Sequence, residues 1–202
     1  MPPVSANKII CFPADLSRAD LGLSPDTLSV FRSKLTKVIH CAWAVNFNLS
    51  VSSFESQHIR GANNLISLCL SVNTPQPAAF YFCSSISAAA GTPLPATITE
   101  TYITQLENAQ NMGYARSKLV VENMIKAAVE KTGIIARVCR VGQIIGDSQD
   151  GIWNSTEAIP LMIQSATTLG ALPELNEVSQ SVLARHSTAD LCDRRHPGFP
   201  AI

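Results

Sequence analysis

Short apolar segments alternate with longer helical segments along this chain, and this alternation restricts its fold more than any other feature. The apolar segments have the composition of strands covered on both faces, and they are Lys8–Phe12, Lys37–Trp43, Ala78–Cys83 and Ile134–Arg140. Helices are predicted between them, at about 25–34, 52–70 and 114–131. Such alternation is typical of α/β proteins with a parallel sheet. The sequence therefore predicts a doubly wound parallel sheet.

Tyr114 and Lys118 stand four residues apart in the third predicted helix, so both side chains lie on the same helix face. An ammonium about 5 Å from a phenol favours the phenolate by roughly 3 kcal/mol at an effective dielectric of about 20. We therefore expect Lys118 to lower the pKa of Tyr114, so that the phenol can act as an acid near neutral pH.

A serine of the segment Ser84–Ser87, at the end of the preceding strand, could hold a carbonyl oxygen against that phenol. Because the segment and the helix flank the end of one strand, the three side-chain types are expected at the carboxyl edge of the sheet. Open α/β folds bind their ligands at this edge. The alternative interpretation is an exposed helix whose tyrosine and lysine share no role.

Composition and charge argue against several classes of partner. The 202 residues contain 15 basic and 15 acidic side chains, so there is no electrostatic reason to expect nucleic acid or an anionic membrane as a partner. No apolar segment is long enough to span a bilayer, and Met1–Ser5 lacks the features of a signal peptide.

The six cysteines show no C-x-x-C spacing, which favours buried, reduced thiols over disulfides or a zinc site. His40 and His58 lack the neighbours of a metal site, and we predict no metal. Reduced thiols and the lack of a signal peptide predict a cytoplasmic protein.

Several motifs occur in an order that carries a family resemblance. They are Asp15-Leu16, His40–Asn46, Ser84–Ser87, Tyr114-x-x-x-Lys118, Arg140–Asp147, Gly151–Asn154 and Ile159–Ile163. Together they resemble the extended short-chain dehydrogenase/reductase superfamily. More closely, the chain is similar to the thioester reductase domains of nonribosomal peptide synthetases, related synthetase-like enzymes and carboxylic acid reductases.

The resemblance implies a Rossmann-like fold and a reaction. NADPH would reduce an acyl or peptidyl thioester on a carrier protein to an aldehyde, or further to an alcohol, in secondary-metabolite biosynthesis. Tyr114 would be the proton donor, and Lys118 would lower its pKa and bind the nicotinamide ribose. Ser85 would hold the carbonyl, with Ser84 and Ser87 as alternatives. The partners would be a carrier-bound thioester or a small carbonyl substrate, and a larger synthase chain.

The resemblance also implies which residues line the cofactor. Next to Tyr114 and Lys118 they would be Asp15 and Leu16 at the adenine, Ala42 and Trp43 at the middle, and Val141, Gln143 and Ile144 at the nicotinamide side. Asp15 could instead cap the turn that follows its strand.

The chain departs from the family at both ends. No G-x-x-G-x-x-G phosphate loop occurs, so we expect a domain that lacks the first β-α-β unit. The strand at Lys8–Phe12 would then lose its neighbours. The expected organisation is a partial NADP-binding domain at 1–147, the start of a substrate-binding subdomain at 148–178, and a divergent tail at 179–202.

Three hypotheses follow from these features. The first is an NADPH-dependent thioester reductase, and the second is a truncated, inactive relative, either a remnant or a partner that docks on a larger synthase. The third is a dehydrogenase of a sugar nucleotide or small carbonyl, against which Gly151–Asn154 argues.

Overall fold

The computed structural model describes residues 8–172 and divides into two units, of which the first ends at Val141 and the second begins at Gly142. The predicted tail at 179–202, and residues 173–178 of the predicted substrate subdomain, lie outside the described residues. The expected boundary after residue 147 stays a prediction. Within the described residues, no helix is both long and apolar enough to cross a membrane.

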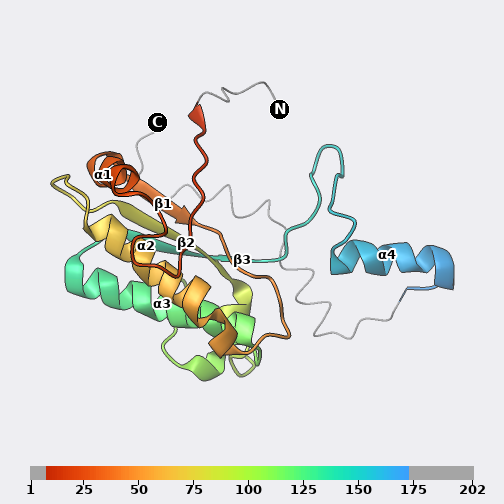
Figure 1. The fold of residues 1–202 in the computed structure, drawn as a ribbon. Helices are drawn as coiled ribbons and strands as arrows, with labels where there is room; N and C mark the ends of the chain where they lie inside the picture. The colour runs from red at the N-terminus through yellow and green to blue at the C-terminus, as the bar shows by residue number, and fades with distance from the viewer. Residues whose placement is uncertain (1–7, 173–202) are drawn as a thin grey trace. The chain divides into compact units, whose positions relative to one another are not determined.

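The first unit is built on a parallel three-stranded sheet of order β1-β2-β3 (Figure 1). Its strands are β1 (Lys37–His40), β2 (Ala79–Ser85) and β3 (Ala136–Val141). Both pairs are parallel, with His40 opposite Phe82, and Phe82 opposite Val138. The α/β fold with a parallel sheet is thus confirmed, and all three strands run toward the same carboxyl edge.

Helices connect the strands. The α-helices are α1 (Pro25–Lys34), α2 (Arg60–Leu70), α3 (Gly113–Thr132) and, in the second unit, α4 (Ala158–Leu169). Four shorter helices are η2 (Val51–Phe54), η3 (Glu55–Ile59), η4 (Ile86–Ala88) and η5 (Leu106–Asn108), of which η3 is a π-helix.

Local signals explain where these helices begin and end. Ser24 caps α1 by accepting a hydrogen bond from the Thr27 amide, ahead of Pro25 at the first turn. Gly133 ends α3 in the left-handed conformation, with φ of 69°. Both of these ends agree with the sequence prediction.

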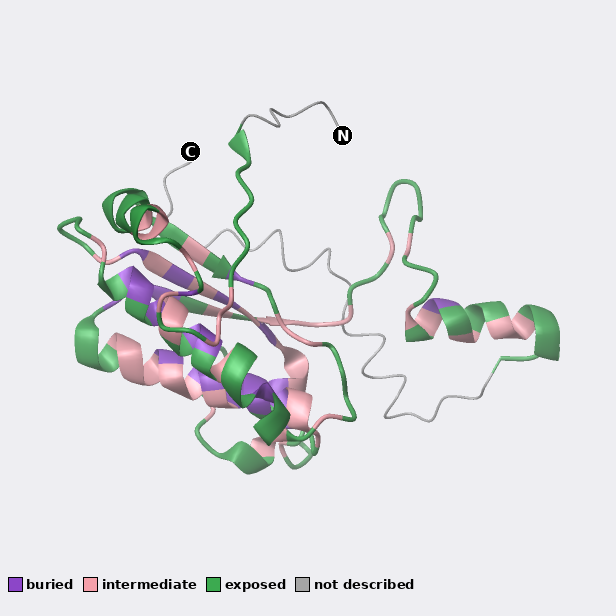
Figure 2. Ribbon diagram, viewed as in Figure 1, coloured by how far each residue is buried: buried purple, intermediate pink, exposed green. Residues whose placement is uncertain are grey.

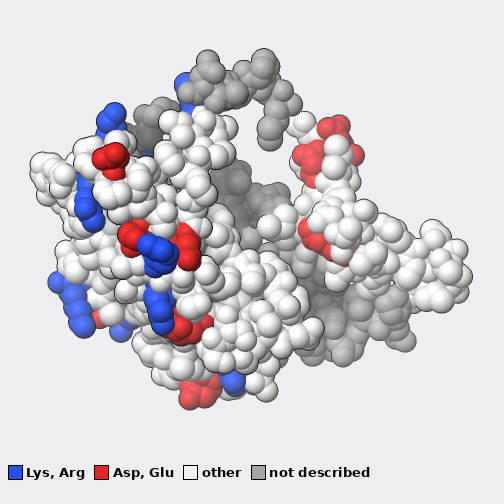
Figure 3. All heavy atoms as spheres, in the orientation of Figure 1, with Lys and Arg blue, Asp and Glu red and all other residues white. Residues whose placement is uncertain are grey.

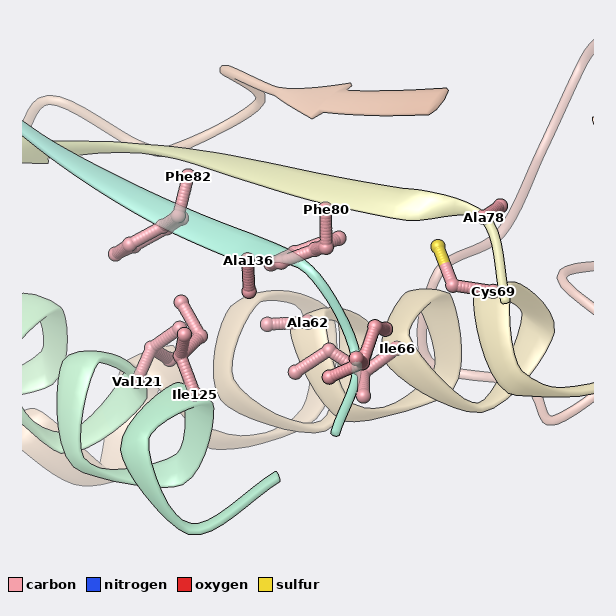
Figure 4. Close-up of a cluster of buried hydrophobic side chains, with 10 residues drawn as sticks. Ala62, Ile66, Cys69, Ala78, Phe80, Phe82, Val121, Ile125 and Ala136 are labelled. Carbon is pink, nitrogen blue, oxygen red and sulfur yellow. The ribbon is translucent and has the colours of Figure 1, made fainter. Parts of the chain in front are cut away.

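The core lies between the sheet and helices α2 and α3 (Figure 4). Phe80 and Phe82 of β2 face these helices and are almost fully buried, together with Val121 and Ile125 of α3. Burial of two phenylalanines and two β-branched residues is the main local source of hydrophobic stabilisation, at about 1.5–3 kcal/mol for each side chain.

The opposite face of the sheet differs from the prediction. The apolar run of β2 is typical of a strand covered on both faces, but the residues of β2 alternate between buried and half-buried. Ile39 on the neighbouring strand is 73% exposed (Figure 2). Within residues 8–141, α2 and α3 therefore cover one face of the sheet and leave the other accessible.

The predicted strand at Lys8–Phe12 is wrong. Apart from a single 3-10 residue at Lys8, the segment has no regular structure, and Ile9 and Ile10 are 72% and 75% exposed. Phe12 contacts Phe31 of α1 edge-on, with ring centroids 5.3 Å apart. A strand needs a hydrogen-bonding neighbour, and this segment pairs with none of the three strands of the sheet.

The cysteines also differ from the expectation of buried thiols. Cys69 of α2 is buried, whereas Cys11, Cys41 and Cys139 are exposed. Cys41 and Cys139 are exposed because they face the uncovered side of the sheet. The described cysteines are free, in agreement with the expectation of reduced thiols.

Candidate functional site

The end of β2 and the start of α3 bring Ser85 and Tyr114 together. A Cβ on Gly113 would clash with the carbonyl oxygen of Leu49, so glycine permits the first turn of α3 to pack against this loop. The Tyr114 ring contacts Phe47 edge-on at a centroid distance of 5.3 Å. The Ser85 side chain lies close enough to its hydroxyl to lower the pKa of the phenol, against the larger effect of burial.

The three candidate serines have different surroundings. Ser84 points into the core, where its hydroxyl donates to Glu122 at 2.5 Å. The Ser87 amide and hydroxyl both donate to Ser85 Oγ, at 3.2 and 2.9 Å. Ser85 is therefore the serine whose hydroxyl lies against the phenol, and Ser87 fixes its orientation.

Lys118 is enclosed by aromatic rings. It is 3% exposed, its Nζ donates to the carbonyl oxygen of Cys83 at 2.6 Å, and the same atom lies 4.4 Å from the Trp43 ring centroid. Phe82 and Tyr114 present further ring faces at 4.9 and 5.7 Å. Burial lowers the pKa of Lys118 to about 8, although the ring faces stabilise its charged form.

The expectation that Lys118 lowers the pKa of Tyr114 is not met in this structure. Burial raises the pKa of Tyr114, and the nearby Ser85 side chain offsets only part of that effect. Lys118 Nζ donates to the Cys83 carbonyl and lies 5.7 Å from the centroid of the Tyr114 ring. A raised pKa keeps the phenol protonated at neutral pH, which suits a proton donor.

His58 is a residue that sequence reasoning considered only as a metal ligand. It lies in the π-helix η3, and its Nε2 accepts a hydrogen bond from the Ala44 amide at 2.9 Å. Its ring packs against Trp43, with centroids 5.0 Å apart. Single-turn π-helices are frequent at functional sites. His58 thus fixes the loop that carries Trp43, and the spacing of Phe54 and His58 on one helix face was the available signal.

Two buried imidazole nitrogens have no hydrogen-bond partner within the described residues, namely His40 Nε2 and His58 Nδ1. Burial, then the charge of Lys118 and then His58 lower the pKa of His40 to about 4. Burial and Lys118 also lower the pKa of His58. Both imidazoles are therefore neutral at neutral pH. In the part of the chain that the structure describes, no group of three or more His, Cys, Asp or Glu could hold a metal ion.

The predicted adenine-side residues form a turn against α2 and η3. Asp15 Oδ1 accepts hydrogen bonds from the Ser17 amide and hydroxyl, at 3.0 and 2.6 Å, and from Gln57 at 3.1 Å. Asp15 thus closes its own turn, as the alternative interpretation held, and these bonds lower its pKa. A Cβ on Gly61 would lie 2.9 Å from Leu16 Cβ, so glycine lets α2 approach this turn closely.

The remaining predicted cofactor residues are divided between the units. Ala42 is exposed, next to Trp43, whose Nε1 donates to Ser117 Oγ at 3.3 Å. Val141 ends β3, directly opposite Ser85. Gln143 and Ile144 belong to the second unit, in which the Gln143 side chain donates to the Ile144 carbonyl at 3.0 Å.

A buried ion pair below the site was missed by the sequence analysis. Glu122 of α3 is fully buried and bonds Arg140 of β3, with 2.7 Å between Arg140 Nη2 and Glu122 Oε2. Ser84 of β2 donates to the same carboxylate. The three elements that carry Ser85, Tyr114 and Val141 are thereby joined through one carboxylate.

The fold and this edge define a class of domain. A parallel sheet with a serine, a tyrosine and a buried lysine at the carboxyl end of its central strand is a Rossmann-like α/β domain.

The particular family follows from the sequence. Over residues 3–193 the chain matches the family described as Male sterility protein, a family of NAD-binding domains, and it belongs to this family. The carboxylic acid reductase of Neurospora crassa is 39% identical over 163 residues, which are 80% of this chain and 15% of that protein. The adenylate-forming reductase Nps10 of Heterobasidion annosum is 35% identical over 170 residues, which are 84% of this chain and 15% of that protein.

A solved structure supports the fold. The terminal R domain from the myxalamid PKS-NRPS biosynthetic pathway matches with a TM-score of 0.70 and 20% identity, over 84% of this chain and 44% of that domain. At this identity, the likeness concerns the fold alone. The chain spans 15% of the length of the two curated relatives. The activity of a whole relative can therefore only be proposed for this chain.

The residues present fit one part of a nicotinamide dinucleotide. The hydroxyls of Ser85 and Tyr114 and the ammonium of Lys118 are the donors that carbonyl and ribose oxygens require. The phosphate side has no such match, because the 202-residue sequence contains no G-x-x-G-x-x-G and hence no loop of that type to hold a pyrophosphate.

Proposed function

We propose that this chain carries the catalytic residues of an NADPH-dependent reductase of the thioester reductase type. The observation that carries the proposal is the position of Tyr114 beside Ser85 at the carboxyl end of β2, one helical turn from the buried Lys118. Its substrate would be an acyl or peptidyl thioester on a carrier protein, reduced to an aldehyde or alcohol. The names of the relatives, carboxylic acid reductase and adenylate-forming reductase, support this choice.

Each residue has a proposed role in this chemistry. Ser85 and Tyr114 hold the carbonyl oxygen of the thioester between their hydroxyls, and Tyr114 donates its proton as negative charge develops there. Lys118 orients the ribose and places a positive charge beside the Tyr114 ring. The nicotinamide, when bound, supplies the hydride. Because burial raises the pKa of Tyr114, the phenol is protonated and ready to donate at neutral pH.

The cofactor-lining roles of the other residues are part of the same proposal. Trp43 and Ala42 border the middle of the cofactor, and the His58 hydrogen bond to Ala44 supports this assignment because it holds their loop in place. The family resemblance supports the choice of NADPH over NADH and action within a larger synthase. The proposed cytoplasmic location rests on the cysteine pattern and the N-terminal sequence.

Tyr114→Phe tests the proposal, because it removes the hydroxyl and keeps the ring. We expect turnover of an acyl thioester with NADPH to fall by about 10²–10⁴-fold, the usual contribution of a positioned proton donor. Binding of NADPH, followed by its fluorescence, should stay close to that of the wild type. Tyr102→Phe is the matched control, since it makes the same change at a partly exposed tyrosine outside the site and should leave turnover unchanged. Equal turnover in Tyr114→Phe would refute the assigned role.

A second candidate is a chain that binds no cofactor by itself and docks on a larger synthase. The absence of a G-x-x-G-x-x-G loop favours it. The titration with NADPH separates the two candidates. Saturable binding at micromolar concentration supports the reductase, whereas no binding up to millimolar NADPH supports the docking role.

A further inference from the structure

Three cysteines lie side by side on the face of the sheet opposite to α2 and α3. Cys83 of β2 and Cys139 of β3 are partners in the parallel register. Cys41 follows His40, whose partner is Phe82, so it continues this register next to Cys83. Cys41 and Cys139 are exposed and Cys83 is half-buried. The proposed reductase chemistry uses none of these thiols.

The register places Cys41 and Cys83 at adjoining positions of neighbouring chain segments, with both side chains on the open face of the sheet. Neighbouring strands lie about 4.8 Å apart, which falls within the range of Cα separations found in disulfides. Cys41 lies just after the last residue of β1, so its backbone is free to adjust. Cys83 and Cys139, in contrast, both lie inside the hydrogen-bonded ladder of β2 and β3.

We propose that Cys41 and Cys83 form a dithiol site that a hydroperoxide oxidises to an intramolecular disulfide. The Cys41 thiolate attacks one peroxide oxygen and the O–O bond breaks, which gives a sulfenic acid and, after protonation, water. The Cys83 sulfur then attacks the Cys41 sulfur and displaces hydroxide, which takes up the Cys83 proton as water. Two thiols and hydrogen peroxide thus give one disulfide and two waters, with both sulfurs oxidised and the peroxide reduced.

Exposure and burial set the order of these steps. The pKa of Cys83 is raised, mainly by burial, and its thiol is therefore the less reactive of the two. The exposed Cys41 meets the peroxide first, and Cys83 resolves the sulfenic acid.

The proposed disulfide would lie next to the candidate active site, because Cys83 also bonds Lys118 through its carbonyl. The carbonyl of Cys83 accepts the hydrogen bond from Lys118 Nζ at 2.6 Å. One residue of β2 therefore connects a thiol on the open face with the lysine on the covered face. A new covalent bond at Cys83 acts directly on the residue that holds Lys118.

The test is treatment of the dilute, reduced chain with hydrogen peroxide, followed by thiol counting and mass spectrometry. We expect the loss of two thiols per chain, and a linkage between the peptides of Cys41 and Cys83 after digestion with trypsin and chymotrypsin, which separates Cys69 from Cys83. Cys139→Ser should form the same linkage at the same rate. Cys41→Ser and Cys83→Ser should lose it.

Three results would overturn the proposal. They are a linkage through Cys139, a linkage between two chains on a non-reducing gel, and stable sulfinic acids at Cys41 without a disulfide. A bimane reagent that fluoresces only after bridging two thiols gives a second readout on the untreated protein. Because Cys83 and Cys139 are also register partners, this readout uses Cys139→Ser as its background. The reagent should label Cys139→Ser but neither of the double variants that add Cys41→Ser or Cys83→Ser to it. These readouts require neither cofactor nor turnover, so their outcome is separate from that of the proposed reductase function.

Discussion

At the scale of single residues, protonation of His40 should make the free energy of unfolding depend on pH. Its ring is 3% exposed, stacks on Phe82 at a centroid distance of 5.9 Å, and lies close to the charge of Lys118. The pKa falls from 6.5 to about 4 in the folded chain, so the unfolded chain binds more protons between these values. Stability contributed by neutral His40 is therefore present above pH 6.5 and is lost as the pH falls toward 4, by at most about 3 kcal/mol. Urea unfolding between pH 4 and 7 measures this loss.

His40→Phe supplies the control, because phenylalanine keeps the stacking ring and takes up no proton. The slope of unfolding free energy against pH should become flatter in this variant. His58 is the other imidazole that faces Lys118, and its lowered pKa adds a slope of the same sign. His40→Phe should consequently retain part of the pH dependence. An unchanged slope would show that His40 is not the group that titrates.

At the scale of elements, the Glu122 carboxylate connects β2, α3 and β3. Removing its charge in Glu122→Gln leaves the guanidinium of Arg140, which is 16% exposed in its side chain, without a counter-charge. Breaking a buried pair on one side costs about 3 kcal/mol. We expect a drop of this size in the free energy of unfolding, measured with urea at pH 7.

The double variant Glu122→Gln with Arg140→Met separates the ion pair from the packing. Because it removes both charges, it should be more stable than Glu122→Gln alone. Equal loss in the single and double variants would mean that the shape of the site, rather than the unpaired arginine, sets the cost.

The elements also show what the sequence can predict. Local signals were enough to predict the start of α1 and the end of α3. Ser24, Pro25 and Gly133 act within one helical turn of these ends. The meeting of Ser85, Tyr114 and Lys118 was predicted as well, because the order of strands and helices places them at one edge. The pairing of Glu122 with Arg140 was not, since nothing in the sequence near either residue marks the other. The pKa of Tyr114 was missed in direction because burial depends on packing that distant segments provide.

At the scale of the whole chain, charge is scarce and balanced. Charged residues are 15% of the sequence and the formal net charge is zero, with an isoelectric point near 6.9. On the first unit, basic and acidic side chains are interspersed, whereas the described residues of the second unit carry acidic side chains and no Lys or Arg (Figure 3). Large apolar side chains such as Ile39 and Ile135 are exposed on the open side of the sheet, at 73% and 57%. Little electrostatic repulsion therefore opposes association through apolar surface near neutral pH.

This balance predicts a solubility minimum close to pH 6.9, because a chain of zero net charge has the weakest repulsion between its copies. Solubility, measured by precipitation with polyethylene glycol, should rise on either side of that pH. Gln105→Glu with Asn111→Asp adds two negative charges at exposed positions and should move the minimum to lower pH. The matched variant with lysine at both positions should move it to higher pH. If both variants keep the minimum of the wild type, apolar contact alone governs association, and net charge has no part in it.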